Sequence, residues 1–281
     1  MENLEFYTLV AALVIYLIAS LLYSAQLIVP AVGNKIDSKF ISKLAAVFTA
    51  SGLILNSSTL LIRYIHSGYP PLGNMYEFLL FFVWGIVLMY LIVETKYNVS
   101  YVGVLALPLV AGLMVWVIFM DKTLRPLMPA LRSNWLYFHV FTAVISYGAF
   151  AVSFVIGILY LIKEGSIGLK KQRGFLFELP KLEILEDLTY RLILVGMPFL
   201  TLVIITGAIW AEIAWSSYWS WDPKETWSLI TWFIYAGYLH TRLMKNWRGK
   251  KSIILVVLGF AAVMFTFAGV NLLLPGLHSY A

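Results

Sequence analysis

Tryptophan is concentrated in one stretch of the sequence. Residues 210–232 hold six of the chain's ten tryptophans: Trp210, Trp215, Trp219, Trp221, Trp227 and Trp232. Indole rings offer rigid, flat area and an N–H donor, so a group of them can stack on a planar macrocycle and reach polar substituents at its rim. A belt of aromatic residues at a membrane surface accounts for one or two rings per span, but not for this density. The stretch therefore predicts a binding surface for a large, flat, apolar ligand.

Polar residues in the same stretch predict the start of a helix. Asp222 precedes Pro223, and Glu225 follows three residues after Asp222. Asp at the cap, Pro at the first helical position and an acidic residue in the first turn are typical of a helix N-terminus. We therefore expect the aromatic surface to be held at a rigid helix start.

Histidine supplies a second kind of chemistry. The four histidines are His66, His139, His240 and His278. Neutral imidazole is a common axial ligand of haem iron, which accepts one ligand on each face of the ring. His139 and His278 fall at the depth of the tryptophans in the membrane topology that the apolar runs and basic residues predict. A lone histidine at a membrane surface is more often an anchor, so position alone leaves anchoring and haem ligation by the pair both open.

The elements that carry these residues follow from composition. The 281 residues are 61% apolar and 12% charged, with a mean hydropathy of +0.86, whereas soluble domains carry roughly 25% charged residues. We therefore expect an all-α, polytopic membrane helical bundle with about eight transmembrane helices, forming a single integral membrane domain over residues 1–281. The apolar runs lie at 6–32, 41–62, 75–93, 101–120, 136–162, 190–212, 226–244 and 252–274.

Basic residues predict the orientation of the bundle. Of the 20 Lys and Arg residues, 15 lie in or beside the connections at 33–40, 94–100, 163–191 and 242–251. Lys and Arg favour the cytoplasmic side, so we expect both termini and the tryptophan-rich loop, residues 213–225, to be extracytoplasmic. The opposite set of connections holds Arg63, Lys122, Arg125, Arg132 and Lys224.

The two remaining histidines have separate expectations. His240 lies 18 residues after Asp222, which is about 27 Å along a helix and places it towards the cytoplasm. There it is either a station for a ligand that crosses the membrane or a snorkelling residue beside Arg242. We expect His66 to lie in a solvated turn.

Composition also excludes several chemistries. The chain has no Cys, so it cannot form a disulfide, a thiolate nucleophile or a cysteine-held iron–sulfur cluster. Any thiol chemistry must come from a partner. The formal net charge of +6 is explained by basic membrane anchors, and we expect no nucleic-acid binding.

The centre of the stretch, Trp-Ser-Trp-Asp-Pro-Lys-Glu-Thr-Trp, resembles the tryptophan-rich WWD signature of the haem-handling proteins of cytochrome c maturation. The segments around His139, His240 and His278 resemble the histidine elements of the CcsA/ResC branch, the system II cytochrome c synthase component. The segment from Pro71 to Glu77 also looks like that branch. The likeness covers residues 70–281, and the first 60 residues only by hydropathy.

This resemblance implies roles for individual residues. His139 and His278 would be the axial ligands of the iron of haem b, and His240 would lie on the route of haem from the cytoplasm. Further contacts with the bound haem would come from Trp215, Trp219, Trp221, Asp222 and Trp227.

The resemblance also implies a function. The chain would hold haem at the extracytoplasmic face and present it to the Cys-x-x-Cys-His motifs of apocytochrome c. It would act within a haem lyase complex with a CcsB/ResB-type membrane partner, surrounded by lipid of a bacterial cytoplasmic membrane or a thylakoid. The sequence leaves open which cytochromes are clients, whether this chain is itself the catalyst, whether haem crosses the membrane through it, and how many partner copies bind.

Two alternatives stay open at this stage. One is a haem-delivery or haem-ligase protein of the system I type, because these proteins share the WWD signature. The other belongs to a different class, a b-type electron-transfer subunit of the membrane. That function needs paired histidines on facing helices inside the membrane, whereas only His240 is expected to lie deep.

Overall fold

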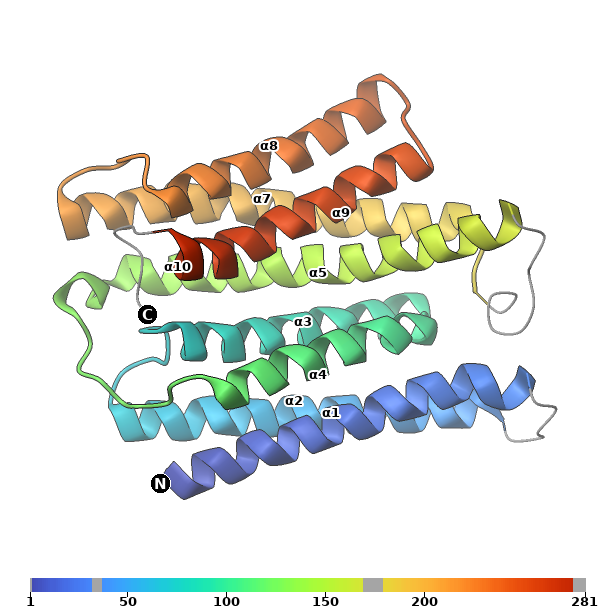
Figure 1. Ribbon diagram of the computed structural model, residues 1–281, viewed down its shortest axis with the longest axis horizontal. Helices are drawn as coiled ribbons and strands as arrows, with labels where there is room; N and C mark the ends of the chain where they lie inside the picture. The colour runs from blue at the N-terminus through green and yellow to red at the C-terminus, as the bar shows by residue number, and fades with distance from the viewer. Residues whose placement is uncertain (1, 32–36, 169–178, 275–281) are drawn as a thin grey trace.

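Long helices lying side by side make up the computed structural model, which describes residues 2–31, 37–168 and 179–274 (Figure 1). The described residues contain no strand. The main helices are α1 (Glu2–Ala31), α2 (Ser38–Ser67), α3 (Met75–Tyr97), α4 (Gly103–Phe119), α5 (Asn134–Gly168), α7 (Leu182–Trp215), α8 (Pro223–Met244) and α9 (Lys250–Met264). A π-helical turn, η3 (Phe265–Gly269), and the short α10 (Val270–Leu273) continue α9. The expected all-α membrane bundle is confirmed.

Helix α8 is the least membrane-like of the eight. The other seven, with Ser100–Val102 counted as part of α4 and η3 and α10 as part of α9, are long and apolar enough to cross a bilayer, and the chain is an integral membrane protein. Helix α8 covers the expected run at 226–244 and lies along α7 and α9 (Figure 1). Its polar residues, including Thr231, His240 and Arg242, lower its hydropathy.

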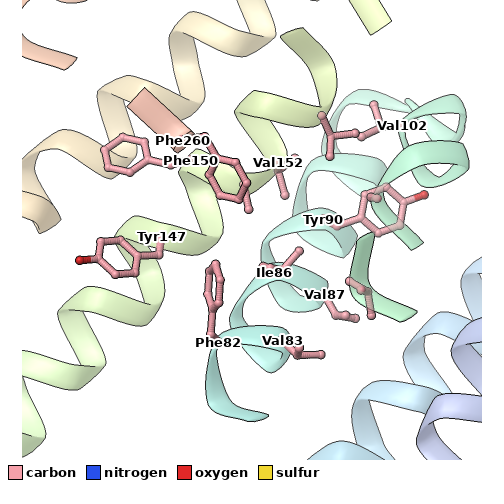
Figure 2. Packing of buried hydrophobic residues seen from close by; sticks show 14 of the residues in the cluster. Phe82, Val83, Ile86, Val87, Tyr90, Val102, Tyr147, Phe150, Val152 and Phe260 are labelled. Carbon is pink, nitrogen blue, oxygen red and sulfur yellow. The ribbon is translucent and has the colours of Figure 1, made fainter. Parts of the chain in front are cut away.

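The helices form two groups. In the first group, α1 packs along α2 and α4 (Figure 1). In the second group, α5 packs along α7, and α8 and α9 pack beside them (Figure 1). Helix α3 contacts α5 and joins the groups. Figure 2 shows the buried rings at this junction, where Phe82 of α3 and Tyr147 of α5 meet edge to face with ring centroids 6.1 Å apart.

Two glycines allow α3 and α5 to approach closely. A Cβ atom added at Gly85 would lie 2.4 Å from Val144 Cγ1, and one added at Gly148 would lie 2.8 Å from the Gly85 carbonyl oxygen. Small residues at such contacts let helix backbones pack tightly inside a membrane. The junction therefore depends on the absence of side chains at these positions.

The structure corrects two sequence expectations near the end of α2. Arg63 lies within the helix rather than in a connection, and only 1% of it is exposed. It forms ion pairs with Glu5 at 3.3 Å and Glu77 at 2.9 Å. His66 also lies in the last turn of α2 rather than in a solvated turn, because the helix continues to a left-handed cap at Gly68.

Candidate functional site

A cavity opens at the end of the bundle that carries the loop between α7 and α8, which we call the tryptophan end. It lies between α3, α5, α7, the start of α8 and the η3–α10 segment. Its empty space, including the open mouth, is about 1080 Å³. Pockets for cofactors are typically apolar clefts with a few polar groups. This cavity fits that description, since its mainly apolar lining also includes His139, Lys224, Glu225, Ser228, Thr266 and Asn271.

His139 projects into the cavity from the second turn of α5. Its Nδ1 atom lies 2.9 Å from the carbonyl oxygen of Val203 on α7. Because a carbonyl can only accept, Nδ1 carries the proton in the neutral ring, and the lone pair is placed on Nε2. A backbone acceptor of this kind commonly fixes the tautomer and orientation of a metal-binding histidine. The arrangement suits His139 to ligate iron, as the sequence predicts.

Gly207 provides the space that this imidazole occupies. A Cβ atom added there would lie 3.0 Å from both Nδ1 and Cε1 of His139. Since Val203 and Gly207 are one helical turn apart on α7, the same face of that helix binds the imidazole and makes room for it. Sequence reasoning did not identify Gly207, because nothing in the sequence marks which α7 residues face α5.

Trp210 forms part of the cavity wall and is itself a packed residue. It is 2% exposed, and its indole N–H donates to the carbonyl oxygen of Ala130 at 2.8 Å. Its ring centroid lies 6.0 Å from that of His139 and 5.0 Å from that of Trp215. Trp215 is absent from the lining and packs against a buried apolar cluster that includes Trp210. Trp210 is therefore part of the cavity wall, and Trp215 packs against Trp210 without lining the cavity.

The loop between α7 and α8 forms the rim. Tyr218 and Trp219 line the cavity. Trp221 lies edge to face against Trp219, with ring centroids 5.7 Å apart, and is 68% exposed. Among the residues predicted to contact the ligand, Trp219 therefore reaches the cavity, and Trp221 stands beside it on the surface.

The predicted helix start at Asp222 is confirmed. The Asp222 side chain accepts from the Lys224 amide at 3.0 Å, and Pro223 occupies the first turn. Glu225 completes a capping box by accepting from the amides of Asp222 at 3.2 Å and Ser220 at 2.8 Å. Asp222 does not line the cavity. Its direct contact with a ligand stays a prediction, and its visible role is to cap α8.

Trp227 has a structural neighbour in the π-helical turn. Its ring centroid lies 4.2 Å from that of Phe265, and it does not line the cavity. The turn itself is defined by the Val270 amide, which donates to the carbonyl oxygen of Phe265. Such single π turns inside α-helices are frequent at functional sites. Here the turn and the residues after it place Thr266, Phe267 and Asn271 on the cavity wall.

Lys224 and Asn271 bring together α8 and α10. The Lys224 ammonium donates to Asn271 Oδ1 at 2.8 Å, and Asn271 Nδ2 donates to the carbonyl oxygen of Phe267 at 2.7 Å. Lys224 belongs to the tryptophan-rich loop segment, outside the spanning segments. Burial lowers the pKa of this lysine to about 8, and nearby Asp222 partly offsets that effect. No local pattern in the sequence marks Asn271 as the neighbour of Lys224, because the two residues lie 47 positions apart.

The structure describes only one of the other two predicted histidines. His240 is exposed on α8 and does not line the cavity that holds His139. His278 lies outside the residues that the structure describes, so its pairing with His139 stays a prediction. The described chain ends shortly after Asn271, whose side chain is already part of the cavity wall.

Comparison with known proteins places these features in a family. Residues 72–278 match the family described as cytochrome C assembly protein. The chain belongs to that family. The matched segment begins at the cavity residue Leu72 and contains the α5, α7, α8 and α10 residues described above, whereas α1 and α2 precede it.

Relatives in the family come from plastids and cyanobacteria. A protein of Pyropia yezoensis named "Cytochrome c biogenesis protein CcsA" is 38% identical, with 94% of this chain and 93% of the relative covered. A protein of the same name from Synechococcus elongatus is 36% identical, with coverages of 84% and 88%. The chain is thus a CcsA-type member of the cytochrome C assembly family.

A solved structure shares the fold. The protein named "Cytochrome c Heme Lyase CcmF" matches with a TM-score of 0.64 and 17% sequence identity. The match covers 94% of this chain but 46% of that structure, so this chain spans slightly less than half of the larger protein. At this identity the comparison supports the arrangement of helices.

Proposed function

We propose that this chain holds haem b in the cavity at the tryptophan end and presents it for covalent attachment to the Cys-x-x-Cys-His motifs of apocytochrome c. The observation that carries the proposal is the position of His139, whose Nδ1 is bonded to Val203 while its ring lines an apolar cavity beside indole side chains. The names of the relatives, which refer to cytochrome c biogenesis, point to the same process.

The cavity suits a porphyrin in three respects. Its mainly apolar lining suits a large flat ring. Trp210 in the wall and Trp219 in the loop place indole side chains along the cavity. One imidazole is held in the tautomer that ligates iron. His278 would supply the second axial ligand, and bound haem iron would then be shielded from small ligands on both faces.

The proposed reaction needs thiols that this chain does not supply. It has no Cys, so the thiols that react with the haem vinyl groups belong to the apocytochrome. The chain would bind and orient the ring while a CcsB/ResB-type membrane partner completes the system II synthase. The distribution of Lys and Arg supports an extracytoplasmic tryptophan end and extracytoplasmic termini.

Replacement of His139 tests the proposal directly. The chain is purified with its partner from cells that make haem, and the absorption spectrum gives haem content and ligation. We expect His139→Gly to lower haem content at least about tenfold and to abolish cytochrome c production. Added imidazole should restore the bis-imidazole spectrum, because a small ligand can occupy the vacated position. Unchanged haem content and spectrum in His139→Gly would contradict the proposal.

His66→Gly serves as the matched control. His66 lies at the same end of the bundle but in α2, and it does not line the cavity. Its replacement is expected to leave both the spectrum and the response to imidazole unchanged. Equal loss of haem from the two variants would indicate a general fault in folding rather than the loss of a ligand.

A further inference from the structure

The cavity described above has an uneven distribution of charge. Among the described lining residues, Lys224 is the single Lys or Arg, and Glu225 is the single acid. The Glu225 carboxylate accepts from the amides of Ser220 and Asp222, so its charge is directed to the loop backbone. The ammonium group of Lys224 is therefore the cationic feature that the cavity presents to a ligand.

Asn271 holds this ammonium group in one place. Its Nδ2 is committed to the carbonyl oxygen of Phe267 at 2.7 Å, which turns Oδ1 towards Lys224 Nζ at 2.8 Å. A lysine side chain has four rotatable bonds, and a fixed acceptor reduces the entropy lost when the ammonium binds a ligand. The residue that orients Lys224 lies 47 positions away in the sequence, on an element positioned by the π-helical turn.

We propose that Lys224 binds a carboxylate of the ligand in this cavity and that Asn271 is its positioning residue. The proposal rests on the proposed function, because haem is a ligand that carries carboxylates. An ammonium–carboxylate hydrogen bond inside a half-buried site is markedly stronger than a neutral one.

The assignment has a consequence for the orientation of haem. Its two propionates leave one edge of the ring, and its two vinyl groups lie on other pyrroles away from that edge. Binding of the propionate edge by Lys224 would therefore turn the vinyl groups away from this side of the cavity. Lys224 would thus determine which edge of the ring is presented to the apocytochrome thiols.

Protonation should be linked to binding. Burial holds the pKa of Lys224 near 8 in the ligand-free protein. A bound carboxylate stabilises the charged form and raises that pKa, so the protonated protein binds more tightly. Affinity for the diacid is then greatest below pH 8. It declines as the pH rises above 8, and the decline ends when the pH exceeds the raised pKa of Lys224 in the complex.

The test compares haem with haem dimethyl ester, in which both carboxylates are blocked. The full chain with its partner is stripped of haem and titrated in detergent, and binding is followed by absorption. We expect the wild type to bind the diacid about tenfold more tightly than the ester. Lys224→Gln should lose this preference while its affinity for the ester is unchanged, and Lys224→Arg should retain the preference. Arg132→Gln, an exposed cation outside the cavity at the same end, is the control and should behave as the wild type.

The outcomes separate this proposal from the one on which it rests. Equal binding of diacid and ester by the wild type would overturn the role of Lys224 while leaving haem binding intact. The same conclusion follows if Lys224→Gln keeps the preference, or if it loses affinity for both compounds equally. Failure of the wild type to bind either compound would instead overturn the proposed function. If Lys224→Gln does not fold, the comparison of diacid and ester binding by the wild type can still overturn the role of Lys224.

Discussion

Arg63 and Glu77 form a buried ion pair behind one wall of the cavity. The Arg63 Nε and Glu77 Oε1 atoms are 2.9 Å apart, and neither side chain is more than 2% exposed. Glu77 Oε2 also accepts from the Gly73 amide at 2.7 Å, and Gly73 lines the cavity. Arg63 donates to the carbonyl oxygen of Lys122 at 2.7 Å. The pair thus connects α2, α3 and the connection after α4 to the wall of the site.

Breaking this pair should destabilise the protein strongly. In Arg63→Met, the carboxylates of Glu5 and Glu77 stay buried without their cation, which typically costs about 3–5 kcal/mol. We expect a clear fall in the thermal unfolding midpoint in detergent, measured by circular dichroism. Arg125→Met is the control, because the Arg125–Asp121 pair is exposed and should contribute little. Similar midpoints for the two variants would contradict a structural role of the buried pair.

The space at Gly207 should be needed for tight binding of the ligand but not for folding. In Gly207→Ala, the new methyl group meets the His139 ring at about 3.0 Å and displaces it from Val203. Changes around a metal-binding histidine typically cost 10–100-fold in metal affinity, so we expect haem affinity to fall about tenfold in an absorption titration. In Gly112→Ala, no atom lies within 4 Å of the new methyl group, and affinity should be unchanged. A Gly207→Ala protein with wild-type affinity would show that the imidazole position is unimportant.

The closely packed contact between α3 and α5 should tolerate no side chain. In Gly148→Ala, the added methyl group lies 2.8 Å from the Gly85 carbonyl oxygen, and backbone cannot move aside as a side chain can. Overpacking of this kind costs about 1–3 kcal/mol, which should appear as a lower unfolding temperature. Gly237→Ala adds the same methyl group in open space and provides the comparison. Equal stability of the two variants would mean that the helices can separate without cost.

Substitution at Asp222 can separate capping from ligand contact. Asp222→Ala removes the acceptor for the Lys224 amide and should cost about 1 kcal/mol of stability, whereas Asp222→Asn keeps a good cap. If capping is its main role, Asp222→Asn will resemble the wild type in both unfolding temperature and haem titration. Weak haem binding by a stable Asp222→Asn protein would instead support the direct ligand contact that the sequence predicts.

Several features could be predicted from the sequence because they are local or averaged over many residues. Apolar runs near 20 residues long predict membrane helices regardless of their neighbours. The order Asp222, Pro223 and Glu225 predicts a helix start, since the capping bonds join residues only a few positions apart. The tryptophan density and His139 likewise indicated the end of the bundle where the cavity lies.

Tertiary structure alone decided which of these side chains meet. Position along a helix gives the depth of a residue, but the direction in which it faces depends on how neighbouring helices pack. This is why Trp219 lines the cavity while Trp215 and Trp227 pack behind or beside it. The pairs Arg63–Glu77 and Lys224–Asn271 join different helices. Local sequence patterns therefore cannot predict them. The amino-acid sequence determined the helices and their polar ends, whereas the contacts between helices selected the residues of the site.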